Sequence, residues 1–178
     1  MRTPLSALML ALALVLPVGA QAPAEGVTTV VLVRHAEKAD EADPDSPISA
    51  AGQARARALV PQLAAFRPDV LIVSQRRRTA ETLAPLAAHL KLSPLVRDNG
   101  KVPELAAELL RDFRGRTVVI GWHHGPHEPL ARALGVKGEL PVWTGSTYDR
   151  IWVIRIDARG AATFEERVQA PVAGASGG

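Results

Sequence analysis

Residues 27–35 read VTTVVLVRH, and this stretch decides the fold. Val27 to Val33 is a run of mostly β-branched residues, and Arg34 and His35 follow it directly. A short apolar run of this kind is typical of a strand that is buried on both faces, as in a parallel sheet covered by helices. The stretch therefore predicts a central strand that delivers a cation and an imidazole to one edge of the sheet.

Two further runs repeat the strand pattern, and segments with helical spacing lie between and after them. The runs are Val70 to Val73 and Thr117 to Ile120. Apolar spacing, a candidate N-cap at Ser49 and the positions of the prolines predict helices over residues 50–66, 79–90, 103–113 and 129–134. Strands that alternate with helices are typical of a parallel α/β sheet with helices on both faces.

The carboxyl end of the chain departs from this alternation. Residues 148–157 and 162–168 both have strand character, and the short segment 158–160 between them contains a glycine. They predict a closing hairpin whose second strand lies antiparallel at an edge. Residues 170–178 are small and predict a disordered tail. We therefore expect one domain, residues 23–169, folded as a three-layer α/β/α sandwich with a mostly parallel sheet and an antiparallel edge strand.

The amino-terminal residues are typical of an export signal. A positive start at Arg2 precedes an apolar segment, residues 5–18, that is too short to span a bilayer comfortably. Residues 20–22 (AQA) have the small-x-small form of a cleavage site. We expect residues 1–22 to be a signal peptide cut after Ala22 or Ala20, and the mature protein to be periplasmic or secreted without stable membrane insertion. A retained amino-terminal anchor helix is the alternative.

Composition limits the chemistry that the chain can use. The 178 residues include no cysteine, which excludes a disulfide scaffold, a cysteine-ligated zinc or iron–sulfur centre, a thiol nucleophile and a lipid anchor on cysteine. Twenty-one basic residues against 18 acidic ones give a formal net charge of +3, which does not imply a nucleic-acid partner. Any catalysis therefore depends on histidine, serine, carboxylates or a metal held by nitrogen and oxygen ligands.

Polar side chains follow each of the three apolar runs. Arg34 and His35 follow the first, residues 74–78 (SQRRR) the second, and residues 121–124 (GWHH) the third. Because the carboxyl ends of parallel strands meet at one edge of a sheet, we expect arginines and histidines to converge there. Arginine offers a planar fork that can bind two phosphate oxygens, and a neutral imidazole can act as a nucleophile. The sequence therefore predicts a phosphoryl site.

Four motifs then occur in an order that resembles the histidine phosphatase superfamily, which contains the cofactor-dependent phosphoglycerate mutases. They are LVRHAEK at 32–38, PISAAGQARA at 47–56, RTAET at 78–82 and GWHHGPHEPLARALG at 121–135. The resemblance covers residues 27–168. It implies a phosphoglycerate mutase-like fold and a hydrolase, a phosphoric monoester hydrolase that acts on a small phosphorylated substrate through a phosphohistidine, with no cofactor and no metal.

The resemblance also implies roles for individual residues. His35 would attack phosphorus through one ring nitrogen while a backbone carbonyl holds the other, and Arg34 and Arg78 would bind the phosphoryl oxygens. A second histidine completes the site. We expect His124 in this catalytic position, because a glycine follows it and because alternation along the strand would point His123 the other way. His123 stays open as the alternative and as a substrate-binding residue.

The proton donor to the leaving group has no motif that identifies it. Glu104, Glu37 and Glu128 are the candidates, and we take Glu104 as the catalytic acid because the loop before the third helix could overhang the site. Its other interpretation is a carboxylate in the first turn of a helix, where it would interact favourably with the helix dipole.

Two other functions stay open at this point. One is a phosphate-ligand binding protein of the same fold that does not catalyse a reaction. The other is a metal site formed by His123, His124 and His127, since closely spaced imidazoles suit zinc or copper. The natural substrate and the oligomeric state are not determined by the sequence.

Overall fold

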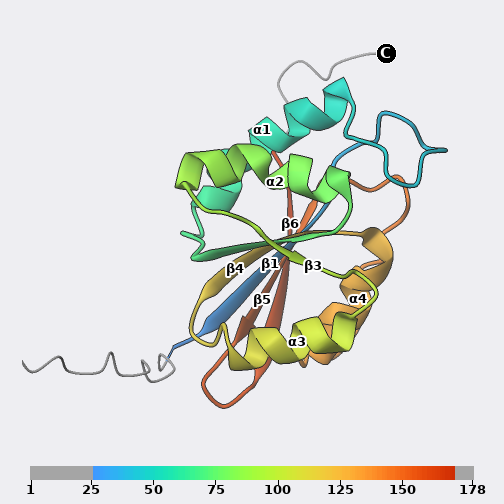
Figure 1. Cartoon of the computed structure of the whole chain (residues 1–178). Helices are drawn as coiled ribbons and strands as arrows, with labels where there is room; N and C mark the ends of the chain where they lie inside the picture. Colours follow the sequence, from blue (N-terminus) through green and yellow to red (C-terminus); the bar gives the residue numbers. More distant parts are fainter. Residues whose placement is uncertain (1–25, 171–178) are drawn as a thin grey trace, which may run out of the picture.

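The computed structural model describes residues 26–170, which form a mixed sheet with helices on both faces (Figure 1). The strands are β1 (Thr28–Arg34), β2 (Val70–Ser74), β3 (Leu95–Arg97), β4 (Thr117–Trp122), β5 (Arg150–Ile156) and β6 (Ala162–Val168). The helices are α1 (Ala50–Ala64), α2 (Arg77–Leu90), α3 (Val102–Arg111) and α4 (His124–Ala133). Within residues 26–170, no helix has both the length and the apolar character that crossing a bilayer requires. The predicted signal peptide, residues 1–22, and the tail from 171 onward lie outside the described residues.

The six strands lie in the order β3-β2-β4-β1-β5-β6. Strands β1 to β4 pair in parallel, whereas β5 is antiparallel to β1 and β6 is antiparallel to β5. This confirms the predicted α/β sandwich with a mostly parallel sheet and a hairpin at one edge. The sequence patterns did not predict β3 at the other edge, because its three residues are too few to show a period and its Leu95 and Val96 are exposed.

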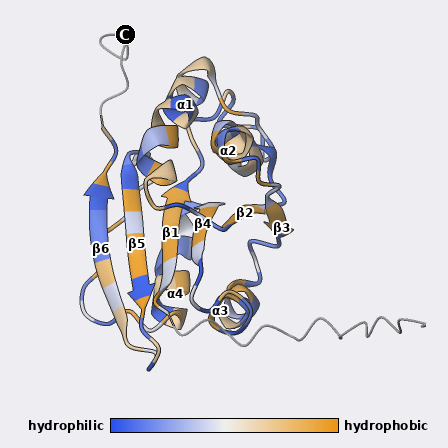
Figure 2. Ribbon diagram, turned by 90° about the vertical axis from the view of Figure 1, so that its left-hand side faces the viewer, coloured by the Kyte–Doolittle hydropathy of each residue, from blue (hydrophilic) through white to orange (hydrophobic). Residues whose placement is uncertain are grey.

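The sheet separates two hydrophobic cores. Val30 and Leu32 of β1 lie in the core with α3 and α4, and Val31 and Val33 lie in the core with α1 and α2. Figure 1 shows these helix pairs on opposite sides of the sheet. Because neighbouring side chains of a strand point to opposite faces, a central strand needs apolar residues throughout. In Figure 2, strand β1 is coloured as hydrophobic, whereas the outer strand β6 carries more hydrophilic residues.

Helices α1, α2 and α3 begin within two residues of their predicted starts, whereas α4 begins earlier. This helix begins at His124 and contains Pro129, where the prediction had placed its start. The earlier Pro126 is tolerated because the first N–H groups of a helix have no partner within the helix. Strand β4 also extends to Trp122, beyond the predicted end at Ile120. The end of β4 and the start of α4 therefore meet at His123. This junction determines where the His123 side chain lies in the site.

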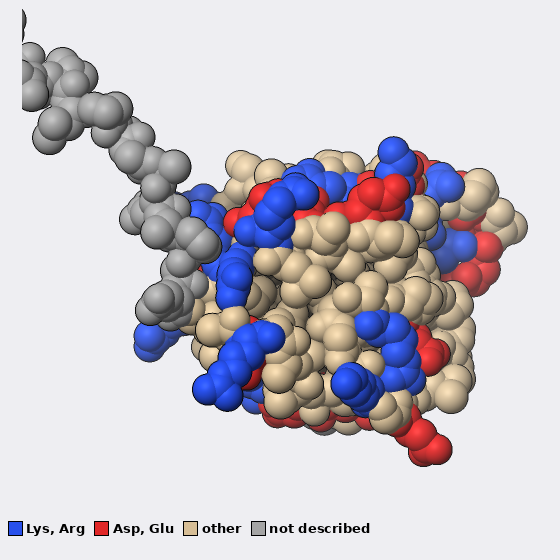
Figure 3. All heavy atoms as spheres, turned by 90° about the horizontal axis from the view of Figure 1, so that it is seen from below, with Lys and Arg blue, Asp and Glu red and all other residues tan. Residues whose placement is uncertain are grey.

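The face of the molecule in Figure 3 carries both positively and negatively charged side chains. Lysine and arginine side chains lie in separate groups on this face, with acidic side chains beside several of them and uncharged surface between them. The formal net charge of +3 is therefore not gathered into one continuous basic patch on this face.

Candidate active site

The predicted convergence at the carboxyl edge of the sheet is confirmed for four side chains. Arg34 and His35 come from the end of β1, Arg78 from the first turn of α2, and His123 from the junction of β4 and α4. The ring centroids of His35 and His123 are 5.4 Å apart, and an Arg78 terminal nitrogen lies 3.3 Å from Nδ1 of His123. The fold thus gathers two guanidinium groups and two imidazoles from distant parts of the chain.

His35 has the features of a nucleophile. Its Nδ1–H donates to the carbonyl oxygen of Ala36 at 2.8 Å, which confirms the predicted backbone contact and leaves the lone pair of Nε2 free. Burial lowers the pKa of His35 to about 3, and the positive charges of Arg34 and Arg78 act in the same direction against the Ala36 hydrogen bond, which raises it. Since an imidazole is neutral above its pKa, His35 is neutral at physiological pH.

His123, rather than the predicted His124, lies beside His35. Arg34 of β1 is paired with Trp122 of β4, and the His35 N–H donates to the Trp122 carbonyl oxygen at 2.9 Å. His35 and His123 directly follow the paired residues Arg34 and Trp122. Their side chains therefore point to the same side of the sheet from adjacent parallel strands. His123 is 7% exposed, whereas His124 is exposed at the start of α4. The structure thus does not place His124 in the cluster, because the argument from alternation considered one strand alone and not its register with β1.

Two polar contacts determine the state of the His123 ring. Arg78 donates to Nδ1, so the proton of the neutral ring lies on Nε2, which donates to the Ser74 hydroxyl at 2.8 Å. Burial lowers the pKa of His123, and together with the neighbouring cations Arg78 and Arg76 it brings the pKa to about 4. Ser74 is thus a hydrogen-bond partner of the second histidine, a role that no sequence pattern indicated.

The threonines of the RTAET motif connect α2 to the strand ends. Thr82 Oγ1 accepts from the Ala36 N–H at 2.8 Å and donates to the Arg78 carbonyl at 2.6 Å. Thr79 Oγ1 accepts from the Ser74 N–H at 3.1 Å. Both threonines are buried. The motif therefore fixes the start of α2, and with it Arg78, against the edge of the sheet that carries His35.

The two site arginines have donors that the described residues leave unused. Nε of Arg34 and Nε of Arg78 are both buried and have no hydrogen-bond partner within residues 26–170. A buried cationic donor without an acceptor is unfavourable, and the oxygens of an anion are the acceptors that guanidinium groups bind most strongly. The pair therefore favours an anionic ligand with several oxygens.

The structure does not bring the predicted proton donor to the cluster. Glu104 is exposed in the first turn of α3, and the described contacts connect it to none of the four side chains. Glu128 is exposed and pairs with Arg132 on the outside of α4. Burial alone would raise the pKa of Glu37, but hydrogen bonds from Arg55 at 2.6–2.9 Å outweigh it, so the net pKa is lowered and Glu37 stays ionised.

The histidines do not form the alternative metal site. His127 is fully buried and stacks on Trp143 with ring centroids 4.1 Å apart. Burial lowers the pKa of His127 to about 3. In the part of the chain that the structure describes, no group of three or more histidine or carboxylate side chains could hold a metal ion.

Sequence reasoning also missed Tyr148. Its ring centroid lies 6.1 Å from that of His35, and its hydroxyl oxygen accepts from Arg34 at 3.3 Å. Tyr148 precedes β5, so only the pairing of β5 with β1 brings it beside the cluster. A lone tyrosine before a strand has no spacing signature that could have revealed it.

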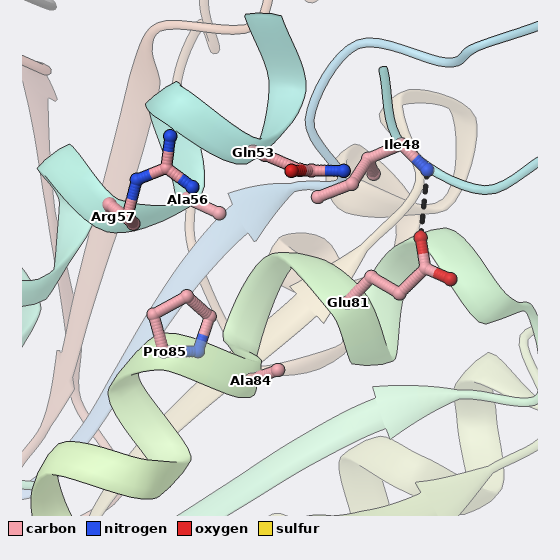
Figure 4. Close-up of a pocket in the computed structure, with 7 residues that line it drawn as sticks. All are labelled: Ile48, Gln53, Ala56, Arg57, Glu81, Ala84 and Pro85. Atoms are coloured by element: carbon pink, nitrogen blue, oxygen red, sulfur yellow. Dashed lines mark hydrogen bonds between the residues drawn. The ribbon is translucent and has the colours of Figure 1, made fainter. Parts of the chain in front are cut away.

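A separate cavity of about 250 Å³ lies between α1 and α2 (Figure 4). Its wall is largely apolar and includes Ile48, Ala84 and Pro85, and Glu81 accepts from the Ile48 N–H at 2.8 Å. None of the four cluster side chains lines it. The cavity is therefore distinct from the candidate active site.

Comparison with a known family agrees with this geometry. A family model described as "Histidine phosphatase superfamily (branch 1)" matches residues 30–100. The matched segment contains Arg34, His35 and Arg78 and ends before His123. The match therefore covers three of the four cluster side chains.

Solved structures share the whole fold. A protein histidine phosphatase, SixA, complexed with tungstate is 24% identical, with a TM-score of 0.66 over 79% of this chain and 97% of that one. A putative phosphohistidine phosphatase SixA from Nakamurella multipartitia is 25% identical, with a TM-score of 0.63 over 85% and 100%. A mycobacterial glucosyl-3-phosphoglycerate phosphatase is 17% identical, with a TM-score of 0.64 over 82% and 100%. Residues 30–100 thus match the histidine phosphatase superfamily model, and the chain shares its fold with solved histidine phosphatases.

Proposed function

We propose that this protein is an exported phosphatase that hydrolyses a small phosphomonoester through a phosphohistidine intermediate on His35. One observation carries the proposal: a neutral imidazole with a free Nε2 lone pair lies among guanidinium groups whose buried Nε donors have no described partner. A phosphoryl group held by Arg34 and Arg78 would bring its phosphorus atom to this nitrogen.

The reaction then has two steps. In the first, the Nε2 lone pair forms a bond to phosphorus, the bond to the ester oxygen breaks with its electron pair, and the leaving oxygen takes up a proton. In the second, a water oxygen attacks phosphorus, the phosphorus–nitrogen bond breaks, its electron pair returns to Nε2, and the water releases a proton. Arg34 and Arg78 stabilise the charge on the equatorial oxygens in both steps.

His123 would support the same charge distribution. In the free site it is neutral and accepts from Arg78. A bound dianion raises the pKa of a nearby imidazole, since an opposite charge favours the protonated form. As Arg78 turns its donors to the phosphoryl group, His123 could take up a proton on Nδ1 and donate a hydrogen bond to the same group.

The comparisons support the reaction class but leave the substrate open. SixA is named a protein histidine phosphatase, and a mycobacterial neighbour is named a glucosyl-3-phosphoglycerate phosphatase. Structures of such neighbours hold tungstate, vanadate or inorganic phosphate. The proposal for this chain is therefore a phosphoric monoester hydrolase with a small phosphorylated substrate. A phosphate-binding protein without turnover remains the second candidate, because none of the carboxylates considered as proton donor contacts the cluster.

Hydrolysis of a chromogenic aryl phosphate tests the function, since its good leaving group needs little protonation. We expect turnover of p-nitrophenyl phosphate that persists after treatment with a metal chelator, because the cationic charge at this site comes from arginines. Inorganic phosphate that binds in calorimetry while the aryl phosphate stays intact would instead favour the binding protein. Loss of turnover with chelator that returns with added metal would contradict the proposed mechanism.

Export is proposed from residues 1–22 alone. The positive start, the short apolar segment and the AQA site support it. Amino-terminal sequencing of the protein made in a bacterial host with a periplasm should give a chain that begins at Pro23 or Gln21. A full-length chain in the cytoplasm would contradict the export part of the proposal without affecting the reaction.

A further inference from the structure

Arg34 lies against Tyr148. The guanidinium carbon is 3.9 Å from the centre of the tyrosine ring, and the NH2 group donates to the hydroxyl oxygen at 3.3 Å. Arg34 is 4% exposed, and Tyr148 is half-buried. An arginine on an aromatic face is attracted to it, and the attraction is stronger when water is largely excluded. The guanidinium carbon thus lies over the face of the ring.

Backbone carbonyls hold the opposite end of the same guanidinium group. NH1 of Arg34 donates to the carbonyl oxygens of Gly145 at 2.6 Å, Thr147 at 3.0 Å and Thr144 at 3.2 Å. The segment that supplies them is anchored, because Trp143 is buried and its Nε1–H donates to the Thr147 carbonyl oxygen at 2.8 Å. The hydrogens of NH1 are therefore committed to the protein.

These contacts leave donors at one edge of the guanidinium group without a described acceptor. Nε of Arg34 has no described partner, and NH2 has one hydrogen beyond that given to Tyr148. Nε and NH2 together form a planar fork that matches two oxygens of a phosphoryl group. The carbonyls fix the NH1 end, but they do not prevent the plane from tilting. The tyrosine ring restricts that tilt.

We propose that Tyr148 is a positioning residue that holds the Nε and NH2 edge of Arg34 toward the phosphoryl group beside His35. The inference rests on the proposed function, since it concerns the same site. It assigns the main effect to the ring, because the guanidinium carbon lies 3.9 Å from the ring centre while the hydroxyl hydrogen bond, at 3.3 Å, is long.

Two variants of Tyr148 separate the ring from the hydroxyl. Tyr148→Leu removes both, and we expect kcat/KM for p-nitrophenyl phosphate to fall about 10- to 30-fold, with orthovanadate binding weakened by a similar factor. Tyr148→Phe keeps the ring face and is expected to stay within about threefold of the wild type. Phe66→Leu is the matched control, because Arg167 stacks on Phe66 at 4.9 Å in a pair that includes none of the cluster side chains. It should leave both measurements unchanged.

A double-mutant cycle with Arg34 distinguishes positioning from a general structural effect. In the Arg34→Ala background, Tyr148→Leu should weaken orthovanadate binding by less than about twofold further, because the group it positions is gone. Equal losses from Tyr148→Leu with and without Arg34, or wild-type values in Tyr148→Leu, would overturn the proposal. Circular dichroism and thermal unfolding of each variant verify that it is folded.

The measurements also separate this inference from the proposed function. If the wild type does not hydrolyse the aryl phosphate but binds orthovanadate, the proposed function fails, and the loss of binding in Tyr148→Leu still supports the positioning of Arg34. If the wild type turns over the substrate and Tyr148→Leu does so equally well, only the positioning role fails. A wild type that neither turns over the substrate nor binds orthovanadate would overturn both.

Discussion

His35→Ala is expected to reduce kcat for p-nitrophenyl phosphate by roughly a thousandfold or more, since removal of a covalent nucleophile leaves only binding and charge stabilisation. The reason lies in the geometry of one ring. Nδ1 of His35 is committed to the Ala36 carbonyl, and burial keeps the ring neutral, so Nε2 is the nitrogen available to phosphorus. Alanine removes that nitrogen and leaves both arginines in place.

Trapping the phosphohistidine intermediate provides a second test of the role of His35. Wild-type protein quenched during turnover of a labelled phosphate ester should carry label that is stable in base and lost in acid, as expected for a phosphorus–nitrogen bond, and His35→Ala should carry none. His89→Ala is a suitable control, because His89 is exposed in the last turn of α2. A His35→Ala protein that retains a tenth of the wild-type rate would exclude His35 as the nucleophile.

Replacement of His123 is expected to have the second largest effect. We expect His123→Ala to lower kcat/KM about 100-fold or more, because it removes a site imidazole and leaves Arg78 and Ser74 without their buried partner. His124→Ala should remain within about threefold, since exposed side chains away from such contacts contribute little. The measurement is steady-state hydrolysis of the aryl phosphate by both variants.

His124→Ala is the control for His123→Ala, because each variant removes one imidazole at the junction of β4 and α4. His123→Gln adds a further test, since glutamine keeps a polar side chain near Ser74 and leaves a smaller cavity than alanine. A larger loss of orthovanadate binding in His124→Ala than in His123→Gln would show that His124 occupies the pocket in solution.

Local sequence patterns were sufficient to predict the three apolar strands of the sheet. The run before Arg34 and the runs at 70–73 and 117–120 are buried strands, because a strand covered by helices on both faces needs apolar side chains at every position. Ser49 caps α1 through a hydrogen bond from the Gly52 N–H, as its residue type and position predicted. Gly52 is also required by packing, because a Cβ there would lie 2.5 Å from the Glu37 carbonyl oxygen.

Other features depend on contacts between residues that are far apart in the sequence. Glu104 has the sequence position of a loop carboxylate, but it lies on the exposed side of a helical turn, and periodicity alone did not show which way that turn faces. The extent of α4 was misjudged because Pro129 was taken as its start, whereas the helix begins at His124 and contains Pro129.

The sequence by itself determined the α/β sandwich and the arrival of arginine and histidine side chains at one edge of the sheet, because apolar runs and helical spacing are local properties and strands that alternate with helices lie parallel. Only the tertiary structure decided that His123 is the partner of His35 and that Tyr148 covers Arg34. The register between β1 and β4 selects one of two adjacent histidines, and the antiparallel pairing of β5 with β1 carries Tyr148 to the site. Both depend on hydrogen bonds between strands, which no single segment of the chain encodes.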